Sequence, residues 1–96
     1  MGLETANVAD FEELVGHKFM VVGTDLCELQ LDKVDLLVKR EESTRQPFAL
    51  VFKGALAQAM QQGTFELQHE QLGALHIFLV PIDETEDIIF YEAVFN

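Results

Sequence analysis

The chain has 96 residues, enough for one ordinary domain, and its 49% hydrophobic residues with only six glycines and two prolines exclude a disordered or fibrous protein. Seventeen acidic residues against six basic ones give a formal net charge of -11, which repels nucleic acid phosphates and anionic lipid surfaces. We therefore predict a single domain, residues 1–96, that binds neither nucleic acid nor membrane.

A short amphipathic helix is predicted near the N-terminus, over FEELV at residues 11–15. Asp10 is expected to cap it, Glu13 to complete a capping box and Gly16 to end it. A helix this short is stable only when its apolar face packs on another element. That face consists of Phe11, Leu14 and Val15.

Alternating apolar residues then predict strands over KFMVV, CELQL and VDLLV, with a turn at Gly23, Thr24 and Asp25 after the first. The apolar positions change from odd to even between residues 31 and 34. A strand absorbs such a change by adding a residue, so we predict a β-bulge near Asp32 and Lys33.

The polar stretch KREESTRQ, residues 39–46, is predicted to be a solvent loop. PFALVF follows as a strand that Gly54 closes. ALAQAMQQ, residues 55–62, is predicted to form one or two helical turns because alanine, leucine, methionine and glutamine favour helix.

The last third predicts a three-stranded antiparallel meander formed by TFELQHE, ALHIFLVPID and IIFYEAVF. A left-handed Gly73 in the first turn places Glu70 opposite Ala74, and the second turn places Ile82 opposite Ile88. With the earlier strands this gives a mainly β fold, a small antiparallel barrel or coiled sheet of five to seven strands.

The meander is apolar on both faces. One face supplies the core, together with inward residues of the earlier strands: Phe19, Val21, Leu29, Leu31, Leu50, Phe52, Phe65, Leu67, Leu75, Ile77, Leu79, Tyr91, Ala93 and Phe95. The other face carries His76, Phe78, Val80, Phe90 and Val94. We expect the N-terminal helix to cover about half of this second face. The remainder predicts an interface, most simply that of a homodimer, or else a contact with a partner protein.

No pattern of catalytic, cofactor-binding or metal-binding residues emerges from the chain. The acidic stretch DETED, residues 83–87, lacks the spacing of a calcium loop and predicts a solvated hairpin tip. His17, His69 and His76 are interpreted as structural, with His17 near the helix C-terminus and the other two on opposite faces. Cys27 is the only cysteine, which favours a buried hydrophobic role and a cytoplasmic location.

The constellation PF-A-LVF-G at residues 47–54, QGTF-L-H--LG at 62–73, and the C-terminal FLVPI and YEAVFN resembles a family of small bacterial proteins classed as a domain of unknown function. The resemblance extends from Phe11 to Asn96. The family is similar to companions of phage-tail-collar-like proteins, which implies a structural or assembly role and no catalytic residue.

Two classes of function follow. The first is a non-enzymatic structural or protein-interaction module, favoured by the doubly apolar meander and by the missing catalytic pattern. The alternative is a small-ligand-binding barrel or minor enzyme in which His69, His76 or Tyr91 lies near a pocket. An interior pocket with converging polar groups favours the alternative, whereas a filled interior favours the first class.

Overall fold

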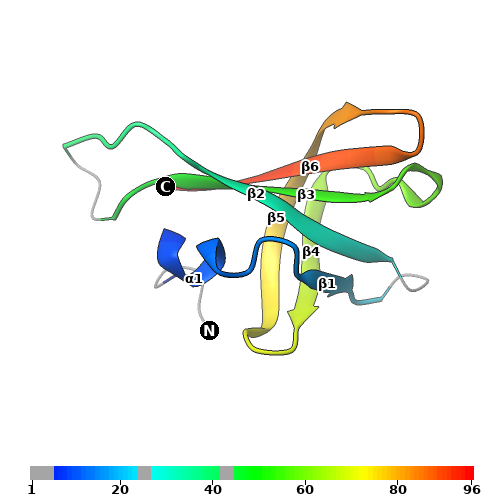
Figure 1. The fold of residues 1–96 in the computed structure, drawn as a ribbon, viewed down its shortest axis with the longest axis horizontal. Helices are drawn as coiled ribbons and strands as arrows, with labels where there is room; N and C mark the ends of the chain where they lie inside the picture. Colours follow the sequence, from blue (N-terminus) through cyan, green and yellow to red (C-terminus); the bar gives the residue numbers. More distant parts are fainter. Residues whose placement is uncertain (1–5, 24–26, 42–44) are drawn as a thin grey trace.

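The computed structural model describes residues 6–23, 27–41 and 45–96. Six antiparallel strands form a closed barrel in the order β1-β2-β3-β6-β5-β4 (Figure 1). The predicted mainly β fold is therefore confirmed. The elements are α1 (Val8–Glu12), β1 (Lys18–Val21), β2 (Glu28–Leu36), β3 (Phe48–Ala55), the 3-10 turn η2 (Leu56–Gln58), β4 (Gly63–His69), β5 (Gly73–Glu84) and β6 (Ile88–Phe95).

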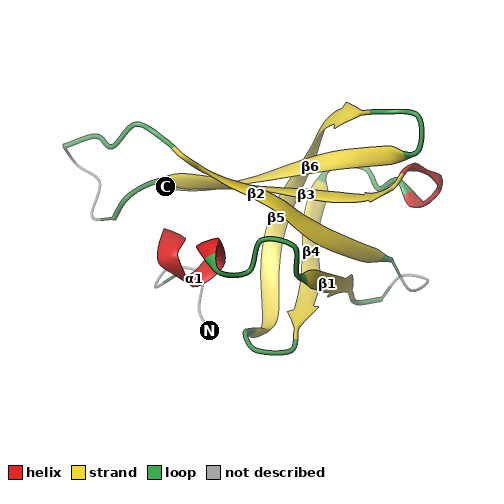
Figure 2. Cartoon of the chain, in the orientation of Figure 1, coloured by secondary structure: helices red, strands yellow, loops and turns green. Residues whose placement is uncertain are grey.

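The barrel consists of two layers that cross steeply, and β5 takes part in both (Figure 2). Its first part, Gly73–Leu79, pairs with β4, while its second part, from Val80 to Glu84, pairs with β6. The register shifts between Pro81 and Asp83, just after β5 changes its partner from β4 to β6 between Leu79 and Val80. A bulge sharpens the local twist, so it suits this corner.

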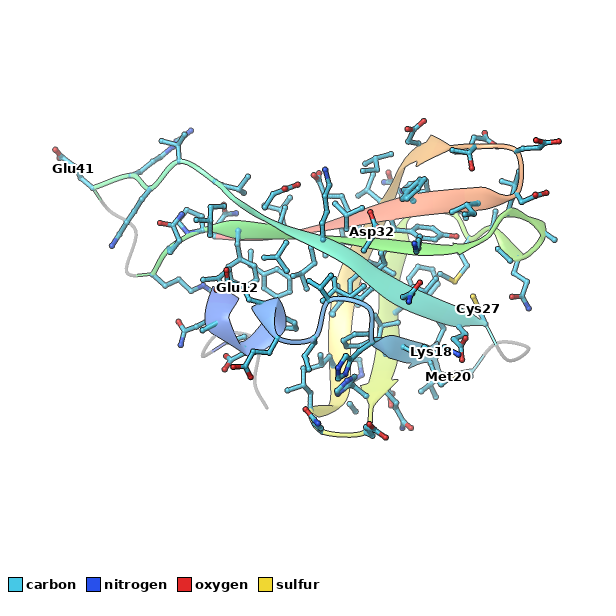
Figure 3. The ribbon with its side chains drawn as sticks, in the orientation of Figure 1. Glu12, Lys18, Met20, Cys27, Asp32 and Glu41 are labelled. Atoms are coloured by element: carbon cyan, nitrogen blue, oxygen red, sulfur yellow. The ribbon has the colours of Figure 1, made fainter. Side chains whose placement is uncertain are left out.

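The bulge predicted near Asp32 and Lys33 is confirmed. The pairing of β2 with β3 shifts between Leu31 and Lys33, which leaves Asp32 as the extra residue. Asp32 lies midway along β2 (Figure 3). Its carboxylate is 3.4 Å from Nζ of Lys53 on β3, so the residue that interrupts the ladder is tied to the neighbouring strand by an ion pair.

The predicted core is also confirmed, since thirteen of its fourteen residues are buried and Phe65 is partly buried and packs against them. They share the interior with other apolar side chains from the described residues, which are Ala6, Phe11, Leu14, Cys27, Phe48 and Ile89. Period-two alternation therefore identified the inner face of nearly every strand.

The helix begins earlier than predicted. It runs over Val8–Glu12 with Asn7 as its N-cap, and the Asp10 carboxylate accepts a hydrogen bond from the Asn7 backbone N–H at 2.8 Å. Asp10 thus has the role expected of Glu13, three residues after the cap. Phe11 is buried as expected, but Val15 is 46% exposed because the helix ends before it.

The predicted registers are wrong, although the predicted faces are right. His69 pairs with Gly73, and Leu67 therefore faces Leu75. The turn still has three residues but begins one position earlier than expected, over residues 70–72, and Nδ1 of His69 accepts hydrogen bonds from two amides within it. A displacement of two positions leaves every side chain on the same face.

The second predicted register fails for a different reason. Ile82 is the bulged residue and has no partner in the ladder, so Glu84 pairs with Ile89 instead of Ile82 with Ile88. The bulge adds one residue to β5, so that Pro81 pairs with Tyr91 on one side of it and Asp83 with Phe90 on the other. Tyr91 lies inside the barrel.

Two smaller predictions around residue 54 are corrected. Gly54 does not close β3, which continues to Ala55; a Cβ at Gly54 would lie 2.7 Å from Cδ2 of Leu29, so glycine lets the two strands approach. Residues 55–62 contain only the 3-10 turn η2, and Leu56 and Met60 anchor this segment on the core.

Loop residues 39–41 are exposed as predicted, and Glu41 lies far from the barrel (Figure 3). Thr24, Asp25 and residues 42–44 lie outside the described residues.

The turn at Gly73 gives a direct test of backbone strain. Its φ is +74°, and a Cβ there would meet nothing within 4 Å, so Gly73→Ala should destabilise the fold by about 1 kcal/mol through backbone conformation alone. Gly63→Ala is the matched control because its Cβ would make an ordinary 3.7 Å contact with Phe65. Urea unfolding measures both variants. Equal stabilities would contradict the left-handed turn.

Candidate functional site

The most prominent surface feature lies where β5 and β6 separate. Val80 pairs with Glu92, but Ala93–Phe95 of β6 continue beside β3 alone, and Gly73–Leu79 of β5 continue beside β4 alone. The two strands diverge from this point (Figure 1). Between them lies a groove of about 570 Å³.

Apolar side chains form both walls of this groove. Phe78 is 52% exposed on the β5 side and Val94 is 53% exposed on the β6 side. Buried core residues reach its floor, because the separated strands do not cover them. We call this feature the β5/β6 groove and define it by its main lining residues, Thr64, His76, Ile77, Phe78, Val80, Glu92, Ala93, Val94 and Phe95.

The groove contains four of the five residues predicted to form an interface: His76, Phe78, Val80 and Val94. The fifth, Phe90, is half-buried farther along β6, opposite Asp83, and does not line the groove. The sequence pattern placed these residues on one outer face, but it gave no sign that two strands part between them.

The helix does not cover this face, contrary to expectation. The ring of Phe11 packs 5.8 Å from the rings of both Phe48 and Phe95, on the core side of β3 and β6. The apolar face of the helix therefore packs on the core side of the barrel. The outer apolar cluster is left to the solvent.

The opposite corner of the barrel is protected. β1 pairs with only the first residues of β2, but beyond them the backbone N–H of Gly16 donates to the carbonyl of Leu31, and the N–H of Leu31 donates to the carbonyl of His17. The chain before β1 thus satisfies an edge of β2. Among the described residues, no backbone hydrogen bond of this kind covers the edges of β5 and β6 at the groove.

Charged side chains surround the groove. Glu66 approaches Nε2 of His76 at 3.5 Å, and Glu92 lies in the lining. Arg45 stands at one end, where its guanidinium donates hydrogen bonds to the backbone carbonyls of Ala6 and Asn96. The lining therefore holds one carboxylate, Glu92, and one guanidinium, Arg45, with Glu66 beside His76; the acidic surroundings come from the net charge of -11 of the whole chain.

Arg45 is more than a residue of a solvent loop, which corrects the sequence prediction for residues 39–46. Its guanidinium carbon lies 5.9 Å from the ring centroids of both Phe48 and Phe95. The cation therefore covers the edge of the aromatic cluster on which the helix packs. A basic residue in a polar stretch carries no sign of such a distant contact.

A second polar feature is a histidine pair that the sequence did not predict. Nδ1 of His17 and Nε2 of His69 are 3.1 Å apart, and the rings stack with centroids 5.3 Å apart. His69 is only 4% exposed, and the centroid of its ring lies 4.7 Å from that of Phe19. The predicted effect of a helix C-terminus on His17 is wrong, since α1 ends at Glu12.

The hydrogen bonds fix the protonation state of His69. Its Nδ1 accepts from the backbone N–H groups of Gln71 at 3.1 Å and Leu72 at 3.3 Å, so the neutral ring carries its proton on Nε2. Nε2 then donates to His17. A metal on Nε2 would force the proton onto Nδ1, against two N–H donors, so the pair does not fit a metal site.

Burial lowers the pKa of His69 below its ordinary value of 6.5, and the neighbouring His17 lowers it further, whereas Glu70 opposes the shift. The described residues contain no group of three or more histidine, cysteine or acidic side chains placed to hold a metal. His69 and His76 lie on opposite faces, as predicted, with His69 buried and His76 exposed.

The barrel interior is occupied by side chains. Tyr91 is fully buried, and its hydroxyl accepts a hydrogen bond from the Met60 backbone N–H at 2.8 Å. Burial is the main cause that raises the pKa of Tyr91, and it also raises the pKa of Cys27. A buried thiol with a raised pKa is a poor nucleophile.

The remaining sequence candidate, the acidic stretch 83–87, forms the exposed tip of the β5–β6 hairpin. The Asp83 carboxylate accepts a hydrogen bond from the Glu84 backbone N–H at 2.8 Å, and the Thr85 N–H donates to the Ile88 carbonyl. Residues 85–87 form the predicted turn, whereas Asp83 and Glu84 are the last residues of β5. Within the described residues there is also no helix long and apolar enough to cross a membrane.

Comparison with known proteins assigns the family. Residues 6–95 match the family model described as Domain of unknown function (DUF6916). The chain belongs to this family. This agrees with the resemblance to a small family of unknown function. Neither a curated protein nor a solved structure matches the chain.

The histidine pair predicts a pH-dependent stability. The lowered pKa of His69 means that the unfolded chain binds more protons than the folded one below about pH 6.5. The stabilisation is present above that pH and is lost as the pH falls, with a slope of at most about 1.4 kcal/mol per pH unit for this one group. Urea unfolding between pH 7.5 and 5.5 measures it.

Glutamine at position 69 keeps a hydrogen-bond acceptor but does not titrate, so His69→Gln should flatten this slope. His76→Gln is the control because His76 is exposed. A slope that His76→Gln removes and His69→Gln retains would contradict the assignment.

Proposed function

We propose that this protein is a non-enzymatic structural or protein-interaction module that contacts its partner through the β5/β6 groove. The observation that carries the proposal is that Phe78 of β5 and Val94 of β6 are exposed on the two walls of the groove between these strands. Burying a large apolar side chain contributes roughly 1.5 to 3 kcal/mol, so these walls favour association.

The filled interior supports this function over a ligand-binding barrel or minor enzyme. Tyr91, which was a candidate pocket residue, has its hydroxyl bound to the main chain of Met60. His69 is held neutral by two amides and His17. The polar groups inside the barrel thus serve the fold.

The identity of the partner is a further part of the proposal. Self-association into a dimer and association with another protein both use the same groove. A role in a phage-tail-like assembly, which the sequence resemblance implies, remains a prediction.

The experiment compares the proteins captured from native cells by the wild type and by Phe78→Asp. We expect at least one partner, identified by mass spectrometry, to be depleted about tenfold or more with Phe78→Asp, because a charge replaces an apolar wall. Val38→Asp is the matched control, since Val38 is 87% exposed and lies outside the groove lining. A capture profile unchanged by Phe78→Asp would contradict the proposed surface.

Adjacent residues on β5 check that the effect is one of surface and not of folding. Phe78→Asp should fold with nearly unchanged stability, whereas Leu79→Asp should unfold the chain, because Leu79 is fully buried. Circular dichroism and thermal melting distinguish the two. If Phe78→Asp also unfolds, Phe78→Ser replaces it in the capture experiment.

A further inference from the structure

We propose that the β5/β6 groove binds one extended segment of a different protein, which adds as a strand to the open edge of β5 and alternates apolar with basic side chains. This inference rests on the proposed function and specifies the class of partner. It follows from three independent features of the groove: its backbone, its side chains and its charge.

The backbone at the groove is that of an unpaired sheet edge. Gly73–Leu79 pairs with β4 on one side, and no strand in the described structure pairs with its other side. In an antiparallel ladder alternate residues direct both N–H and C=O to the same neighbour, so the free side presents an alternating row of donors and acceptors. An extended chain satisfies such a row with its own main chain.

This edge lacks the usual protection. Proteins shield edges with proline, lysine or a bulge, but here Pro81 and the bulged Ile82 come only after the open stretch ends. The comparable edge of β2 is covered by Gly16 and His17. The fold therefore blocks one open edge and leaves the other accessible.

The side chains of the groove fit a strand with apolar residues at every second position. His76, Phe78 and Val80 alternate along the outer face of β5, and Val94 faces the same groove from β6. A strand added beside β5 has the same two-residue period, so its outward side chains contact Phe78 directly. Side chains between them face the apolar floor formed by Ile77 and Phe95, so the apolar set fits this floor. The basic set then lies on the outer face, on which Glu66 and Glu92 also lie.

The charge of the protein selects a basic partner. Glu66 and Glu92 lie beside the apolar walls, and the whole chain carries a formal charge of -11. Arg45 lines the groove at one end, where it donates to the carbonyls of Ala6 and Asn96, so the basic residues of an incoming strand belong beside Glu66 and Glu92. Basic residues on an incoming strand are attracted by this field, and acidic ones are repelled.

The same charge argues against a second copy as the occupant. Two copies would bring two net charges of -11 to one contact, and these repel each other. A strand from another, basic protein avoids this repulsion.

The test uses a seven-residue blocked peptide that alternates lysine with valine or phenylalanine, titrated into the uniformly ¹⁵N-labelled protein. We expect saturable binding, with slowed hydrogen exchange at alternate amides between residues 73 and 79. Replacing every lysine by glutamate should weaken binding at least tenfold. Phe78→Ala should weaken it by a similar factor, whereas Val38→Ala should leave it unchanged.

Backbone methylation separates strand addition from general apolar contact. Methylation of one alternating set of peptide nitrogens should abolish binding, while methylation of the other set, which faces away from β5, should leave it intact. Equal effects of the two sets, equal binding of the glutamate peptide, or shifts confined to residues outside the groove would each overturn the inference.

Two outcomes keep this inference separate from the proposed function. If Phe78→Asp removes a captured partner but the alternating peptide does not bind, the partner class is wrong and the groove remains the interface. If light scattering finds a dimer that Phe78→Asp dissociates, the occupant is a second copy, which overturns this inference and supports the broader function.

Discussion

The structure depends on one constraint, the change of partner along β5. A single strand of twelve residues pairs first with β4 and then with β6, so it joins two layers that would otherwise be separate. The bulge at Ile82 lies just beyond this change and adds a residue to β5 within its pairing with β6. Because Gly73–Leu79 of β5 pairs with β4 alone and Ala93–Phe95 of β6 pairs with β3 alone, the barrel is closed where Val80–Glu84 meets β6 and open beside it.

The opening must be sealed on its inner side for a core to exist. Phe48 and Phe95 stack with centroids 4.8 Å apart, and Phe11 packs on both of them. Arg45 then covers the edge of this cluster and binds the carbonyls of Ala6 and Asn96. The short helix and the arginine thus complete the core at the place where the ladder of strands fails.

Local chemistry explains which parts of this arrangement were predictable. Alternation identifies the inner and outer faces, and it placed Phe78 outside and Leu79 inside correctly because the two-residue period survives errors of register. The bulge at Asp32 was visible as a change of phase. Such features depend on neighbouring residues only.

The features that failed depend on residues far apart in sequence. The position of the turn before Gly73 involves the ring of His69, whose other nitrogen contacts His17, 52 positions away in the sequence. The role of Arg45 requires contacts with both Ala6 and Asn96. The groove itself arises because two predicted strands pair over only part of their length. None of these contacts leaves a periodic signal, so faces were predictable from the sequence while the site was not.

The net negative charge of the chain opposes pairing between the open edges of two identical molecules. An unpaired strand bordered by Phe78 invites pairing with an identical edge on another molecule, which is the first step of aggregation. Neither proline nor lysine lies within Gly73–Leu79 to prevent it. Repulsion between copies of net charge -11 opposes that association and leaves the backbone groups of β5 accessible. Charge can therefore protect the edge where local geometry does not, and it does so selectively, because the field that repels identical copies attracts a basic strand.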